Sequence, residues 1–64
     1  MKEILEEGYK DVVRTSLDYI KDNIKCIEAE LEKSHSYKYY MNEKATHISY
    51  EIGALKRMFE VQND

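Results

Sequence analysis

The sequence predicts an all-α protein, an antiparallel helical hairpin with heptad-like packing. The 64 residues contain no proline and two glycines, whereas a β-rich domain needs turn residues every 8–12 positions or so. The apolar residues recur in alternating steps of four and three, which is the spacing of helices that pack as coiled coils. A polar stretch without this spacing separates two such series. Together these observations indicate two helices and a turn.

The first predicted helix covers about residues 2–32. Towards the N-terminus its apolar residues leave the regular spacing and fall at Ile4, Leu5 and Tyr9, so we expect a break near Gly8. The regular stripe consists of Val13, Leu17, Ile20, Ile24, Ile27 and Leu31.

The second predicted helix covers about residues 37–61. Its stripe consists of Met41, Ala45, Ile48, Ile52, Leu55 and Phe59. Residues 33–36 between the helices are poor helix formers and read as the turn, with Ser34 or Ser36 as a candidate cap of the second helix. One continuous coiled-coil helix of about 90 Å is the alternative. The two stripes are in phase across the turn, and no glycine marks it.

Assembly follows from the size of the chain. A core in a single domain of this length seldom supplies more than about 3–5 kcal/mol, and Cys26 has no second cysteine to pair with. A second ridge recurs every seven residues on each helix; it consists of Leu5, Val12, Tyr19 and Cys26, and of Tyr40, His47 and Ala54. We therefore expect a homodimer that closes into a four-helix bundle. The predicted oligomer core is Leu17, Ile20, Ile24, Ile27, Leu31, Met41, Ile48, Ile52, Leu55 and Phe59.

Charge and cysteine content narrow the class of partner. The net charge is -3, which argues against nucleic acid as the main partner. Residues 1–32 carry nine acidic and five basic side chains, and residues 33–64 carry four acidic and five basic side chains, so the charges of the two halves are weakly complementary.

The apolar runs are too short for a membrane span. A lone thiol fits a reducing compartment, so we predict a cytoplasmic protein.

No residue pattern indicates catalysis. His47 lies four residues from both Glu43 and Glu51, and Glu32 and His35 have the Glu-x-x-His spacing of di-iron proteins. Both patterns read as ordinary helix-surface and turn residues, because neither comes with the further ligands that a metal site needs. We predict no enzyme activity, no metal and no cofactor.

Tyrosine is the unusual residue type, with six copies. Aromatic side chains mixed with charge on an exposed helix face are typical of protein-binding surfaces. The predicted partner surface is Tyr37, Lys38, Tyr39, Tyr40, His47, Tyr50 and Arg57. The sequence thus favours a small regulator or inhibitor that binds a larger protein, and the size and class resemble proteins that phage and other mobile elements encode. The alternatives are a structural coiled-coil oligomerisation module and a small transcriptional or nucleic-acid-binding regulator.

Overall fold

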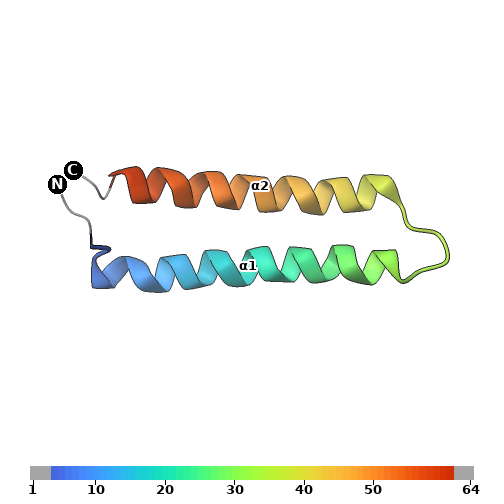
Figure 1. The fold of residues 1–64 in the computed structure, drawn as a ribbon, viewed down its shortest axis with the longest axis horizontal. Helices are drawn as coiled ribbons and strands as arrows, with labels where there is room; N and C mark the ends of the chain where they lie inside the picture. The colour runs from blue at the N-terminus through green and yellow to red at the C-terminus, as the bar shows by residue number, and fades with distance from the viewer. Residues whose placement is uncertain (1–3, 62–64) are drawn as a thin grey trace.

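The computed structural model describes residues 4–61, which form two antiparallel α-helices. Helix α1 spans Glu7–Leu31 and helix α2 spans Lys38–Val61. They lie side by side over their whole length (Figure 1), in a rod of 51 × 16 × 12 Å. The prediction of an all-α helical hairpin is confirmed, and the single continuous helix is excluded. Residues 1–3 and 62–64 lie outside the described residues, and with them the predicted start near residue 2.

The connection between the helices covers residues 32–37, slightly more than the predicted 33–36. Glu30, in the last turn of α1, organises it with both its backbone and its side chain. The Glu30 carboxylate accepts a hydrogen bond from the backbone N–H of Tyr37 at 2.9 Å, directly before α2 begins. The Lys33 ammonium lies 3.0 Å from the other carboxylate oxygen. An acidic side chain at a helix N-terminus also interacts favourably with the helix dipole, so α1 supplies the N-terminal cap of α2.

Ser36 plays a different role from the one its position suggests. Its hydroxyl donates to the backbone carbonyl of Glu30 at 2.9 Å, and so satisfies the end of α1 rather than the start of α2. The Lys33 N–H donates to the same carbonyl at 3.2 Å. No described residue has a positive φ angle. The turn therefore has no position that requires glycine, which explains why the sequence contains none there.

The contact line between the helices, here called the seam, uses only half of each predicted apolar stripe. Val13, Ile20 and Ile27 of α1 are partly buried in it. The corresponding half of the α2 stripe is Met41, Ile48 and Leu55. Each set recurs every seven residues, as a coiled-coil position does.

The other half of the seam on α1 is polar. Three of the four buried described residues are polar, Ser16, Asn23 and Glu30 at 9%, 5% and 3% exposure, and the fourth is Leu55 at 8%. The Ser16 hydroxyl donates to the Glu51 carboxylate across the seam at 2.8 Å. The Asn23 amide donates to the Tyr19 backbone carbonyl at 2.8 Å. Hydrogen bonding thus compensates the burial of these polar groups.

The hairpin has little core for its size. The chain exposes 5335 Å², while a compact monomer of 7.7 kDa exposes about 4,300 Å². Its radius of gyration of 15.0 Å exceeds the value of about 11 Å expected for a compact chain of this length. No large side chain among the described residues is fully buried. The isolated hairpin therefore leaves apolar area in water that a stable domain of this size would bury.

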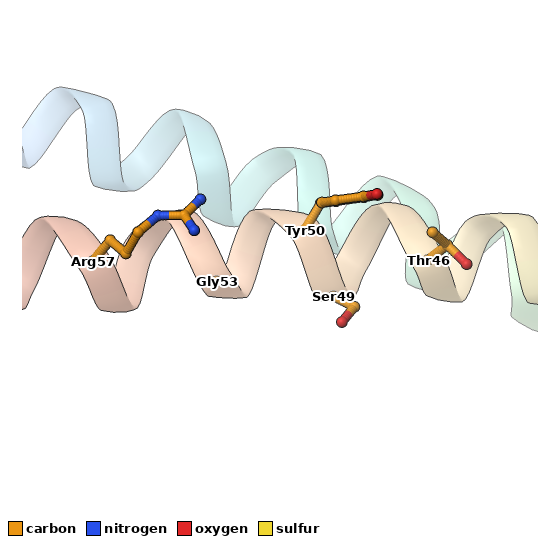
Figure 2. A pocket seen from close by; sticks show the side chains of 5 residues that line it. All are labelled: Thr46, Ser49, Tyr50, Gly53 and Arg57. Carbon is orange, nitrogen blue, oxygen red and sulfur yellow. The ribbon is translucent and has the colours of Figure 1, made fainter.

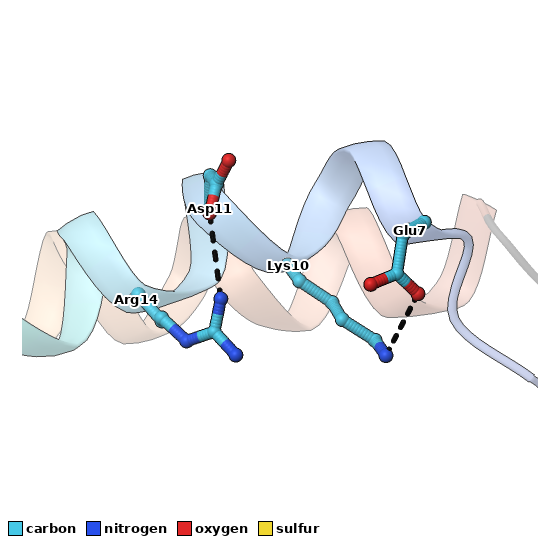
Figure 3. A network of polar contacts seen from close by, with 4 residues as sticks. All are labelled: Glu7, Lys10, Asp11 and Arg14. Atoms are coloured by element: carbon cyan, nitrogen blue, oxygen red, sulfur yellow. Dashed lines mark hydrogen bonds and ion pairs between the residues drawn. The ribbon is translucent and has the colours of Figure 1, made fainter.

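Ion pairs on α1 add little stability to compensate for the small core. Lys10 lies 2.9 Å from Glu7, and Arg14 lies 3.4 Å from Asp11 (Figure 3). Both pairs join residues three apart on the same helix; Glu7, Arg14 and Asp11 are largely exposed to solvent, and Lys10 is partly exposed. Such pairs support the first turns of α1 locally and are screened by salt. They do not hold α1 against α2.

Candidate interaction surfaces

The apolar residues that the seam leaves out form one edge of the hairpin. This apolar edge consists of Leu17, Ile24 and Leu31 on α1 and of Ala45, Ile52 and Phe59 on α2. The exposures of its large members are 41% for Leu17, 43% for Ile24, 59% for Leu31, 45% for Ile52 and 42% for Phe59. Within each helix the members recur every seven residues, so they stand in a row along one side of the seam.

A ring contact on the opposite side shows that both rows belong to the same edge. The rings of Tyr19 and His47 have centroids 6.3 Å apart. Tyr19 lies two residues after Leu17, and His47 lies two residues after Ala45. Because two residues make slightly more than half a helical turn, each aromatic residue lies on the opposite side of the seam from the apolar row of its own helix. Because Tyr19 and His47 meet on one side, the rows that start at Leu17 and Ala45 lie together on the other.

The side that holds Tyr19 and His47 is the second ridge predicted from sequence. This tyrosine edge consists of Val12, Tyr19, Cys26, Tyr40, His47 and Ala54. The ring of Tyr19 contacts that of His47 here, although Val12 at 50% and Tyr19 at 44% exposure are as accessible as the residues of the apolar edge. The Lys44 ammonium lies 5.2 Å from the centroid of the Tyr40 ring, within the range of a cation–π contact. Hydrogen bonding to the Cys26 side chain, together with burial, raises the pKa of Tyr40 above its ordinary value of 10.0.

The outer face of α2 carries the most exposed tyrosines. Tyr39 is 91% exposed and Tyr50 is 74% exposed. Beside Tyr50 a shallow hollow of about 280 Å³ opens to solvent over Gly53. Figure 2 shows Arg57 extending towards Gly53 from one end of the hollow, with Thr46 at the other end. Arg57 has no ion-pair partner among residues 4–61.

The predicted partner surface is thus divided among three places. Tyr39, Tyr50 and Arg57 lie on the outer face of α2, as expected, while Tyr40 and His47 lie on the tyrosine edge against α1. Tyr37 and Lys38, also part of that predicted surface, are exposed at the turn and the first residue of α2. Sequence reasoning missed the hollow, although Gly53 in the middle of a helix, without a side chain, was a signal for it.

The histidine and carboxylate patterns do not converge in the structure. Glu51 accepts the Ser16 hydrogen bond in the seam, His47 packs on Tyr19, and Glu43 is exposed. Within residues 4–61, no three His, Cys, Asp or Glu side chains come together as metal ligands would. Neither described helix is long and apolar enough to cross a membrane.

Hydrogen bonds and charges at the turn shift the pKa values of Glu30 and Lys33. The hydrogen bond from the Tyr37 backbone N–H, followed by that from the Lys33 side chain, lowers the pKa of Glu30 below its ordinary value of 4.5. The same carboxylate raises the pKa of Lys33 above 10.5. Neither residue lines the hollow on α2. These shifts therefore reflect the hydrogen bonds of the cap at the turn.

Fold and surfaces together define a helical hairpin that presents an apolar edge, a tyrosine edge and an aromatic outer face on α2. No known family model, no characterised protein and no solved structure matches this chain.

Proposed function

We propose that this chain is a non-enzymatic, cytoplasmic protein-binding regulator that works as a homo-oligomer on a larger protein. One observation carries the proposal: aliphatic side chains of the apolar edge are exposed to solvent, while the polar residues Ser16, Asn23 and Glu30 are buried in the seam. Exposed apolar area of this extent marks an interaction site. A hairpin built in this way is one part of an assembly.

The outer face of α2 supports a second contact, with the larger protein. Tyr50 and Arg57 flank the hollow over Gly53, and neither residue type is needed there to hold α2 against α1. Tyrosine and arginine are the residues most enriched among those that dominate binding energy. A complementary partner would place an aliphatic or small side chain in the hollow and a carboxylate near Arg57.

Affinity purification from a cytosolic extract with quantitative mass spectrometry tests this function. Tagged wild type should retain a defined larger protein, and Tyr50→Ala should retain it at least about tenfold less, the loss expected for a central interface tyrosine. Glu28→Ala is the matched control, because Glu28 is exposed on α1. Its retention should equal that of wild type.

The second candidate is a structural oligomerisation module without a separate target. The apolar edge favours it equally, since self-association needs nothing more. If wild type retains only copies of itself, or if Tyr50→Ala retains the larger protein as well as wild type does, the regulator proposal is wrong. The first of these results leaves the oligomerisation module as the function.

A further inference from the structure

We infer that the apolar edge is the surface on which a second copy of this chain packs, while the tyrosine edge and the outer face of α2 stay accessible. This inference rests on the proposed function and specifies which side of the hairpin self-associates. From the sequence, a dimer of hairpins could cover both the main apolar stripes and the second ridge. The structure favours the apolar edge, because five of its six residues are exposed large hydrophobics, compared with three of six on the tyrosine edge.

The first argument is area. At about 200 Å² for a fully exposed large apolar side chain, the apolar edge presents roughly 450–500 Å² in one hairpin. Two copies packed face to face bury about twice that, and residues flanking the rows bring the total towards the range of about 1,200–2,000 Å² found for stable interfaces. The edge is thus large enough for a dimer of this chain.

The second argument is chemistry. The six residues that define the apolar edge carry no charge and no hydrogen-bonding side chain. A surface of this kind is self-complementary, as the interface of a two-fold symmetric dimer must be. The tyrosine edge is different, because its Tyr19 ring already meets His47 and its Tyr40 meets Cys26 and Lys44.

The third argument is stability. The hairpin has one buried hydrophobic residue among those described, Leu55, so the apolar edge must be covered whenever the chain is folded. Another copy of the chain is present wherever the chain is made, at the same concentration. Packing of one apolar edge on another brings Leu17, Ile24 and Ile52 next to the half-buried Ile20 and Ile48. A four-helix bundle with both halves of the predicted stripes inside is the result.

Two alanines provide a matched test of the edge. Ala45 lies on the apolar edge and Ala54 on the tyrosine edge of the same helix, and both are exposed in the single hairpin. In a Cys26→Ser background, Ala45→Cys and Ala54→Cys each carry one thiol and change little else. The rate of alkylation by iodoacetamide is measured over a range of protein concentration, alongside the mass from sedimentation equilibrium.

We expect the thiol at position 45 to react at least about tenfold more slowly than that at position 54 in the dimer. The difference should disappear on dilution to the monomer. Equal rates at a concentration where the mass is dimeric, or protection at position 54 alone, would overturn the choice of edge and leave self-association intact. A folded monomer at every concentration would overturn self-association itself, and so the proposed function with it.

Discussion

Asn23 offers a direct test of how the helices are oriented. It is 5% exposed in the seam, although it lies outside the apolar stripe. Burying a leucine side chain contributes about 1.5–3 kcal/mol relative to leaving it exposed. Loss of the Asn23 to Tyr19 hydrogen bond costs about 1 kcal/mol, and the higher helix propensity of leucine returns about half of that. Asn23→Leu should therefore stabilise the fold by about 1–2.5 kcal/mol.

Thermal unfolding followed by circular dichroism, at one fixed protein concentration, measures the effect. A gain of 1 kcal/mol corresponds to about 4–8 °C in melting temperature for a chain of this size. Asn42→Leu is the matched control, because Asn42 is exposed on α2 and gains helix propensity alone. If Asn23→Leu melts no higher than Asn42→Leu, position 23 does not lie in the seam and the reasoning is refuted.

Two further predictions concern the turn and the hollow. Because the Tyr37 N–H and Lys33 hold the pKa of Glu30 below 4.5 in the folded chain, its carboxylate adds stability above that pH and loses it as the pH falls through the folded-state pKa. Glu30→Gln should therefore lower the melting temperature at neutral pH, and its difference from wild type should shrink below pH 4.5; a constant difference would contradict the capping role. At Gly53 an added Cβ meets no atom within 4 Å, so Gly53→Ala should stabilise α2 by about 0.5–1 kcal/mol, a rise in melting temperature that calorimetry detects. The same methyl group narrows the hollow beside Tyr50, and a lower melting temperature would show that the space is not open.

The helices and the hairpin were predictable because one physical signal dominates. Apolar residues at alternating steps of four and three produce two long stripes, and no proline interrupts them. The turn was harder to place. Its stability comes from Glu30, which reaches from α1 to the Tyr37 N–H, and sequence spacing does not show which glutamate makes such a contact.

The orientation of the helices was the main feature that the stripe left open. Val13, Ile20 and Ile27 belong to the seam in any orientation, but either Leu17 or Ser16, four or three residues after Val13, can complete it. Hydrophobicity favours Leu17, whereas the structure places Ser16 inside, bonded to Glu51. In a two-helix hairpin, each helix can bury only one of these two positions against the other helix. Which position is buried depends on long-range polar contacts and on whether a second hairpin covers the apolar edge.

Only part of the candidate partner surface could be predicted from the sequence. The exposure of Tyr39, Tyr50 and Arg57 follows from their position around the helix, on the side away from the apolar stripe. The engagement of Tyr40 and His47 does not, because it depends on which residues of α1 stand opposite them. Those neighbours are Cys26 and Tyr19, and they are set by the register of the hairpin, which no motif in the chain specifies.

Sedimentation equilibrium of the wild-type chain, combined with melting curves over a range of concentration, tests the central claim that the hairpin is completed by a second copy. We predict a mass of twice the 7.7 kDa chain and a melting temperature that rises with protein concentration, as mass action requires. A 7.7 kDa monomer that unfolds cooperatively at a temperature independent of concentration would contradict it.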